Sequence, residues 1–231
     1  MPFPGYAAED QDLLDGLTTF SPSVALLEAE GLAYDGYGTE GMMPLVAAGT
    51  MVADAPSAVD PAECQPIISA LNLATDEDAT ARSDDPIVSV VVLYPDGDAG
   101  GAGLAASVRA RVFDDPAAAT AVLDAVAGAS GCTGFVQTLV GPPAELTADG
   151  VEVSTPIIDG LDGPTARIDL RVVQIVDSET GATQPIDEAE TSYYAVVDRV
   201  LLRAQVGSDT SNSLAADVLA EVAGHLEGAA A

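Results

Sequence analysis

The chain has 231 residues, and its 37 Asp and Glu residues against seven Arg and no Lys give a formal net charge of -30 at pH 7. A disordered acidic chain would be poor in apolar residues, whereas 48% of this sequence is hydrophobic, which predicts a folded core under an anionic surface. Such a surface repels phosphate backbones and anionic lipid headgroups, so nucleic-acid binding and peripheral membrane binding are both disfavoured.

The first part of the chain shows little regular pattern. No run approaches the ~20 apolar residues that cross a bilayer, so we expect no membrane-spanning segment. The start also lacks the basic stretch and apolar core of a signal peptide. Leu13, Leu14 and Leu17 suggest one short helix, and residues 44–53 could form a strand. We therefore interpret residues 1–53 as an irregular N-terminal arm with a short helix.

Regular structure is predicted to begin at Asp60. Asp60, Pro61 and Glu63 match the N-cap, first and third positions of a helix, which we expect over residues 61–73. The β-branched run over residues 86–94 predicts a buried strand. A turn rich in Gly and Asp follows it. Residues 107–113 then alternate apolar side chains with arginines, which predicts the second strand of a hairpin.

Asp115 and Pro116 repeat the helix-start signal, and the helix that they open is expected to end near Cys132. A closing helix is predicted to begin at Asn212, where Leu and Val residues follow one stripe. Between these helices, turn residues separate four further predicted strands, at residues 135–140, 151–158, 167–176 and 191–206.

This order of elements predicts the fold class. Runs of consecutive strands with hairpin-length connections and helices at intervals favour an α+β fold. We expect an antiparallel sheet of about five to six strands with the helices packed on one face. This domain would span residues 54–227, and residues 228–231 would form a frayed tail.

The two cysteines, Cys64 and Cys132, each lie beside a predicted helix. A lone even pair at such positions is typical of a disulfide in an oxidising compartment. The alternative is two separate buried thiols, which are common in protein cores. With a single His in the chain, a zinc site would lack soft ligands.

The segment DAPSAVDPAECQPIISAL, the helix ending in AVLDAVAGASGCTGF, the long closing strands and the final helix resemble one known family. They look like the extracellular domain of the serine/threonine protein kinase H family of actinobacteria and the secreted lipoproteins similar to it. The resemblance covers about residues 54–226. It implies a cell-envelope protein with an antiparallel sheet and a groove for an undefined ligand. Nothing here matches the loops of a kinase catalytic domain, so a free-standing lipoprotein-like relative is the closer comparison.

Few residues suggest catalysis. His225 could be a general base, but no nucleophile elbow accompanies it, which favours a helix-end His stabilised by the helix dipole. Asp96 and Asp98 begin like a calcium loop, yet the loop lacks a third ligand and the closing Glu. The acidic group that includes Asp76 and Asp78 follows from composition alone. We therefore expect no catalytic residue, no metal site and no cofactor.

Six of the seven arginines lie on predicted strands with matching parity in pairs, so they could project from one sheet face as a basic stripe. Such a stripe would bind an anion or a glycan; the alternative is pairing with Asp169, Asp198 and Glu152. Tyr193, Tyr194 and Phe113 could line an apolar pocket, or they could belong to the core. The candidate ligand-binding residues are Arg109, Arg111, Arg167, Arg171, Arg199, Arg203, Tyr193 and Tyr194.

Together these observations predict an extracytoplasmic domain of the cell envelope, secreted or cell-surface anchored, that binds a ligand or acts as a sensor and has no catalytic activity. Its partner would be an envelope ligand or protein and not a nucleic acid. Two alternatives come from other classes. One is a carrier of a lipid or other hydrophobic molecule, and the other is a hydrolase that uses a pair of carboxylates.

Overall fold

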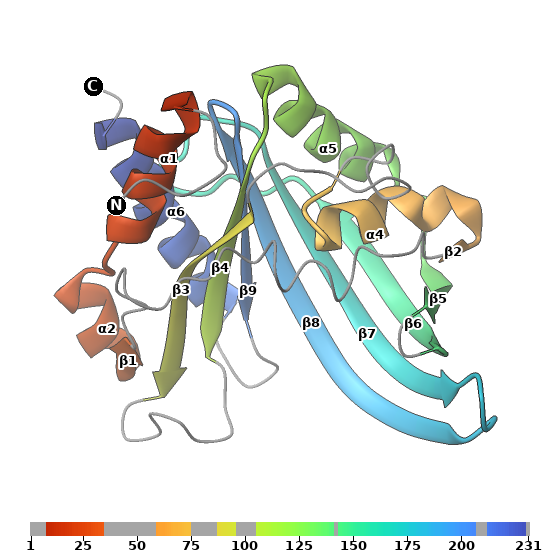
Figure 1. The fold of residues 1–231 in the computed structure, drawn as a ribbon. Coiled ribbons are helices and arrows are strands. Elements are labelled where there is room, and N and C mark those ends of the chain that lie inside the picture. Colours follow the sequence, from red (N-terminus) through yellow and green to blue (C-terminus); the bar gives the residue numbers. More distant parts are fainter. Residues whose placement is uncertain are drawn as a thin grey trace.

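The structure is a computed structural model, and it describes residues 8–34, 59–74, 87–95, 105–140, 143–206 and 212–229. These residues form helices around one large antiparallel sheet (Figure 1). No helix among them is both long and apolar enough to cross a membrane. The helices are α1 (Ala8–Thr19), α2 (Val24–Glu30), the short 3-10 helix η1 (Ala62–Cys64), α4 (Gln65–Leu71), α5 (Pro116–Gly128) and α6 (Asn212–Ala229).

The sheet has nine strands in the described part of the chain, in the order β1-β3-β4-β9-β8-β7-β6-β5-β2, and every neighbouring pair is antiparallel. The α+β class is therefore confirmed, with more strands than the five to six expected. The strands are β1 (Leu32–Tyr34), β2 (Val59–Asp60), β3 (Ile87–Pro95), β4 (Ala106–Val112), β5 (Gly134–Val140), β6 (Pro143–Ser154), β7 (Thr165–Asp177), β8 (Thr183–Val197) and β9 (Val200–Val206).

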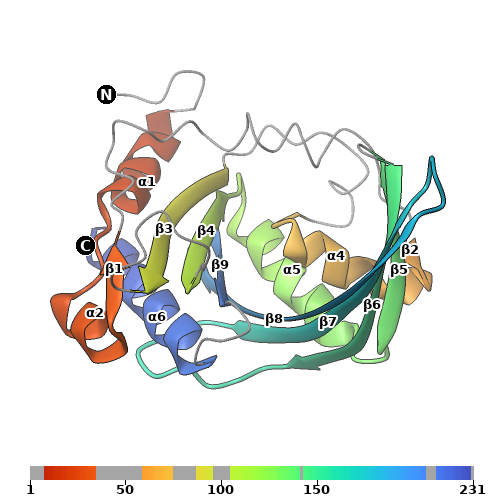
Figure 2. The same ribbon diagram turned by 90° about the horizontal axis from the view of Figure 1, so that it is seen from below.

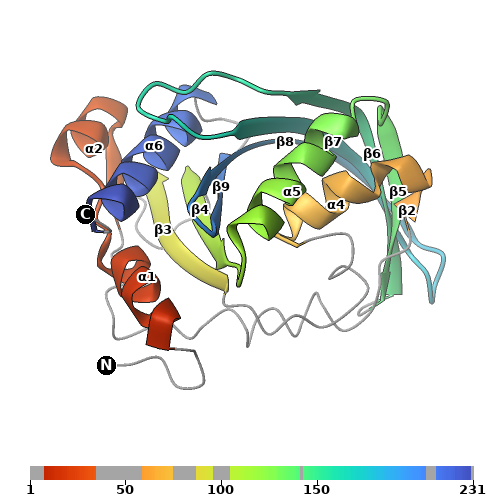
Figure 3. The same ribbon diagram turned by 90° about the horizontal axis from the view of Figure 1, so that it is seen from above.

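Helices cover both faces of this sheet, so the expectation of helices on one face is wrong. Alternate residues of β8 belong to different apolar clusters, Tyr193 with α1 and α6, and Tyr194 with α4 and α5. Figures 2 and 3 show β6, β7 and β8 curving around α4 and α5, with α6 on the opposite side. We call these the concave face and the convex face. Both need cover because β8 and β9 are apolar at successive positions, as in Ala195, Val196 and Val197.

The N-terminal segment contributes to the core. Leu14 and Leu17 of α1, both almost completely buried, pack in the cluster on the convex side, and β1 pairs with β3 at one edge of the sheet. Ser23 caps α2, and its backbone N–H donates to Glu221 of α6 at 2.9 Å. The described part of the expected arm is thus two helices and an edge strand. The expected strand at 44–53 and the domain boundary at 54 lie outside the described residues.

Cys64 and Cys132 form a disulfide, as the sequence predicted, with their Cα atoms 5.1 Å apart. Cys64 ends η1, and Cys132 follows α5, so the bond joins the two helical segments on the concave face. The helix near Cys64 begins later than expected, because Asp60 belongs to β2, where it pairs with Val136 of β5.

The predicted strand over residues 191–206 is in fact a hairpin. β8 ends at Val197 and β9 begins at Val200, and Asp198 between them has the left-handed φ of 52°. Asp adopts this conformation more readily than most residues, which permits a two-residue turn without glycine. β7 and β8 are also longer than expected, at 13 and 15 residues. Their far ends extend beyond the helices (Figure 1).

Candidate functional site

The expected basic stripe on one face does not form. Arg109, Arg111 and Arg203 lie on the concave face, because they share strand parity and register with Leu201 and Tyr194 of the cluster below α4 and α5. Arg167 and Arg171 have the opposite parity and lie on the convex face. Parity was predicted correctly for the two arginines of β4 and the two of β7. The relation between strands was not, because it depends on the hairpin turns and on β-bulges in β3, β6 and β7.

Arg199 lies in the turn between β8 and β9 and not on a strand. Its Nη1 donates to Asp10 of α1 at 2.6 Å and to the Phe113 carbonyl oxygen at 3.1 Å. The side chains of Arg199 and Asp10 are 13% and 10% exposed. This ion pair therefore joins the first helix to the sheet and has a structural role.

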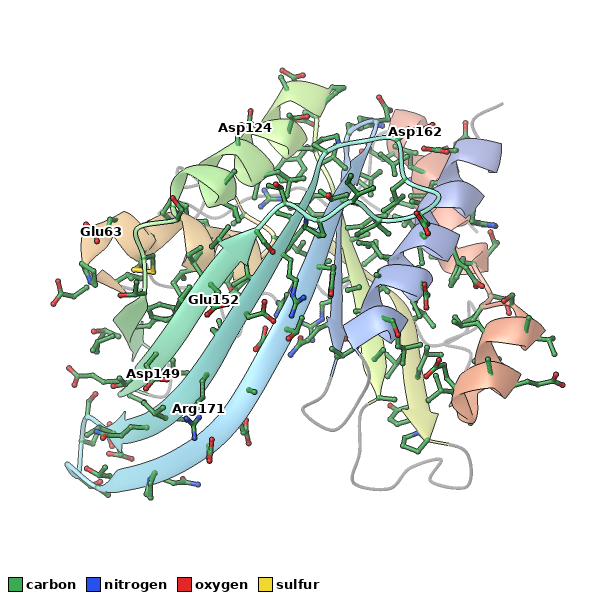
Figure 4. All side chains as sticks on the ribbon, turned by 180° about the vertical axis from the view of Figure 1, so that it is seen from behind. Glu63, Asp124, Asp149, Glu152, Asp162 and Arg171 are labelled. Atoms are coloured by element: carbon green, nitrogen blue, oxygen red, sulfur yellow. A yellow bond between two sulfur atoms is a disulfide. The ribbon has the colours of Figure 1, made fainter. Side chains whose placement is uncertain are left out.

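The two arginines of the convex face pair with carboxylates. Arg167 donates at 2.7 Å to Asp169, one of the three carboxylates expected to pair with the arginines, and its guanidinium lies 5.3 Å from the centre of the Tyr193 ring. Arg171 donates to Asp187 at 2.6 Å. Figure 4 shows Arg171 near Asp149 and Glu152 on this polar face. The Asp187 carboxylate raises the pKa of Arg171, and the charge of Asp149 raises it by a smaller amount.

On the concave face, Arg111 and Arg203 hold the C-terminal end of α4. Arg111 is 2% exposed, donates to the Leu73 carbonyl oxygen at 2.9 Å and stacks on Phe113. Arg203 reaches the Leu71 carbonyl oxygen and forms an ion pair with Glu190. Arg203 thus satisfies a carbonyl group that the end of α4 leaves without an intrahelical partner, and Arg111 satisfies one in the turn that follows the helix.

Arg203 is the centre of a polar cluster that sequence analysis missed. Its Nε donates to the Ser192 hydroxyl at 3.1 Å, and its Nη2 donates to Glu190 and to the Gln205 side-chain oxygen. The Ser192 hydroxyl also donates to Glu190 at 3.1 Å. Alternation along β8 would have placed Glu190 and Ser192 on the face of Tyr194. Pairing them with Arg203 requires the register of β9, which the sequence does not show.

Arg109 differs from the other five arginines in the described part of the chain. It lies directly opposite Arg203 on β4, is exposed, and has no hydrogen bond or ion pair to any described residue. Partial burial lowers its pKa, the Arg203 charge lowers it further, and Glu190 opposes both. A guanidinium beside a second cation, without a carboxylate bound to it, can accept an anion.

Tyr193 and Tyr194 do not line one pocket, because they lie on opposite faces of β8. Both are buried, at 6% and 0% exposure, and Phe113 belongs to the same core cluster as Tyr194. Burial raises the pKa of Tyr194 to about 12, against a lowering by the Arg203 charge. Both tyrosines are therefore core residues in this structure.

His225 has a structural contact. Its Nε2 lies 3.0 Å from the Gly16 carbonyl oxygen of α1, and its ring meets Phe20 edge to face. Within the described ranges, no three His, Cys, Asp or Glu residues are grouped as a metal site. Asp76, Asp78, Asp96 and Asp98 lie outside those ranges.

One hollow lies away from the arginines, between α5 and the loop over residues 155–165. Its volume is about 430 Å³, and its walls include Leu123 and Asp124 of α5 and Ile157 and Asp162 of the loop. Ile157 is 96% exposed. Asp124 and Asp162 are labelled in Figure 4. This hollow is open and mostly apolar, and it lacks an arrangement of groups that could carry a reaction.

No protein-family model matches the chain, and no curated protein sequence is significantly similar to it. Among solved structures, the extracellular domain of PknH from Mycobacterium tuberculosis is similar over 96% of this chain and 97% of that domain. The TM-score is 0.52 and the sequence identity is 14%. The likeness shows a shared fold, and it confirms the resemblance that the sequence predicted.

Proposed function

We propose that this chain is an extracytoplasmic ligand-binding or sensor-type domain of the cell envelope, without catalytic activity of its own. Two observations support the location. The fold matches almost the whole of a domain described as extracellular, and the disulfide between Cys64 and Cys132 is a bond that persists in oxidising compartments. A fold by itself does not give a function, so the binding activity must rest on the site.

The observation that carries the binding activity is the guanidinium of Arg109, which has no hydrogen bond or ion pair to any described residue. The other arginines in the described part of the chain either hold structural elements together or pair with carboxylates on the surface. In a chain with 37 acidic residues and seven arginines, an exposed arginine without a carboxylate partner in the described ranges is unexpected from composition. We infer that the concave face near Arg109 is the ligand-binding surface.

The proposal of a domain without catalytic activity rests on the sequence, which contains no nucleophile elbow, zinc-protease motif or lysine-containing phosphate-binding loop. A carrier of a hydrophobic molecule and a carboxylate-dependent hydrolase are the two rivals. The carrier would need an enclosed apolar cavity, whereas the hollow beside α5 is open. The hydrolase would need two carboxylates across a substrate cleft.

Native mass spectrometry of freshly purified protein, combined with a panel of ester and glycoside substrates, separates these functions. The proposal predicts a polar small molecule as the retained ligand and no turnover of any substrate. A retained lipid would favour the carrier. Turnover that a single Asp or Glu substitution abolishes would refute the proposal and favour the hydrolase.

A further inference from the structure

We propose that Arg109, Ser107 and Gln205 form an oxyanion site on the concave face, which binds the carboxylate, sulfate or phosphate group of a small ligand. This inference rests on the proposed binding function and names the chemistry of its ligand. The three residues come from two neighbouring strands, β4 and β9. Arg109 supplies the charge, and the other two supply neutral hydrogen-bond donors.

Register places these side chains together. Ser107 is paired with Gln205 across β4 and β9, and Arg109 is paired with Arg203 in the next row on the same face. Side chains of directly paired residues have Cβ atoms about 5 Å apart. Residues two apart on a strand are separated by about 7 Å. One oxyanion group with several oxygens can therefore reach all three side chains.

Ser107 lies two residues from Arg109 on the same face of β4 and offers a hydroxyl donor beside it. Ser107 is 7% exposed, and its hydroxyl makes no hydrogen bond to any residue that the structure describes. Since Ser107 shares a strand face with Arg109, an anion bound to Arg109 can accept a hydrogen bond from the Ser107 hydroxyl.

The orientation of Gln205 is fixed by Arg203. A guanidinium has donors and no acceptor, so the Gln205 amide must present its oxygen to Arg203 Nη2, at 3.2 Å. Its NH₂ group then points away from Arg203 and is available as a donor. Glu190 neutralises Arg203 through their ion pair. The uncompensated positive charge of the cluster is therefore that of Arg109.

The geometry of the guanidinium defines the ligand class. Its planar fork of N–H groups matches two oxygens of a carboxylate, sulfate or phosphate, whereas a halide offers a single centre. The charge of -30 on the chain opposes any anion. At 0.15 M salt the Debye length is about 8 Å, so distant carboxylates are screened, and the local donors determine binding.

The test is a titration of the arginine side-chain Hε–Nε signals by nuclear magnetic resonance. With seven arginines and no lysine in the chain, the spectrum is simple, and each substitution assigns one signal. Sodium acetate, sodium sulfate and sodium phosphate are compared with sodium chloride at equal ionic strength. The variants are R109Q and S107A, and R171Q is the matched control because Arg171 is exposed on the opposite face and paired.

We expect at least one of the three oxyanions to shift the Arg109 signal saturably, and the strongest of them identifies the group in the ligand. R109Q should weaken that binding about tenfold or more and S107A about threefold or more, while R171Q leaves it unchanged. Equal, non-saturating shifts at Arg109 and Arg171, or equal binding by R109Q, would overturn the site.

Failure of the site and failure of the function give different results. If the purified protein retains a polar small molecule but no oxyanion binds at Arg109, the binding function stands and this site is wrong. If the protein turns over a substrate, the proposed function is wrong, whatever the oxyanions do.

Discussion

Arg109 and Arg203 face each other on neighbouring strands, yet their environments differ. Arg203 is 7% exposed and engages four acceptors, Leu71, Glu190, Ser192 and Gln205, whereas Arg109 is exposed and engages no described residue. We propose that this difference separates a structural arginine from a binding one. Residue type and strand parity cannot make the separation, because both arginines have the same parity relation to the core.

The Arg203–Glu190 ion pair should stabilise the fold. We expect E190Q to lower the free energy of unfolding by about 1–3 kcal/mol, because it leaves a mostly buried guanidinium without a countercharge. The matched control is D187N, which removes the charge from the exposed Arg171–Asp187 pair and should have no measurable effect. Urea unfolding of both variants is the measurement. Equal effects would show that burial of the pair is unimportant.

Tyr194 should make the fold sensitive to alkali. Burial raises its pKa to about 12, above the ordinary value of 10.0. The fold therefore favours the neutral phenol, a contribution that is complete below pH 10 and is lost as the pH rises through 12. Y194F removes the ionisable group. Its stability relative to the wild type should increase between pH 10 and 12 in unfolding experiments, and a pH-independent difference would contradict the assignment.

The helices show which local signals are reliable. Asp115 caps α5 as predicted, since its carboxylate accepts from the Ala117 N–H at 2.9 Å. The same signal at Asp60 predicted too early a start for the helix near Cys64, because pairing with β5 holds Asp60 in an extended strand. A capping motif was therefore informative where no strand competed for it. At Asp60 the pairing of the strands decided the outcome, and a single sequence does not determine that pairing.

The strands show the same limit. The apolar runs predicted β3, β4 and the core of β7, but the hairpin between β8 and β9 was missed because Asp198-Arg199 is not one of the usual glycine turns. The short strands β1 and β2 contain three and two residues, which is too few for a periodic pattern. Missing the β8–β9 hairpin also hid the polar cluster of the candidate site, because the pairing of these two strands brings Glu190 and Arg203 together.

The disulfide should contribute a large part of the stability of the α4–α5 region. It closes a loop with a sequence separation of 68, for which the loop-entropy model gives about 4 kcal/mol as an upper value. We expect reduction to lower the urea midpoint substantially, and thiol titration of the oxidised, denatured protein to find no free thiol. An unchanged midpoint after verified reduction would contradict this expectation.

At the scale of the whole molecule, the charge of -30 should destabilise the fold at low ionic strength through repulsion between carboxylates. Added NaCl shortens the Debye length from about 30 Å at 0.01 M to about 8 Å at 0.15 M. The thermal midpoint should therefore rise with NaCl and then level off.

Calcium at matched ionic strength is the control for this prediction. It should add little, because the sequence contains no complete calcium loop. A saturable shift of the midpoint at micromolar Ca²⁺ would instead reveal a specific cation site, and Asp76, Asp78, Asp96 and Asp98 would be the first residues to substitute.

The central claim is that the concave face binds an anionic ligand through Arg109. Native mass spectrometry of wild type, R109Q and R171Q, each incubated with the same bacterial envelope extract, tests it most directly. We predict one small-molecule adduct of constant mass on the wild type and on R171Q, and its loss from R109Q. The same adduct on R109Q at wild-type occupancy would contradict the account.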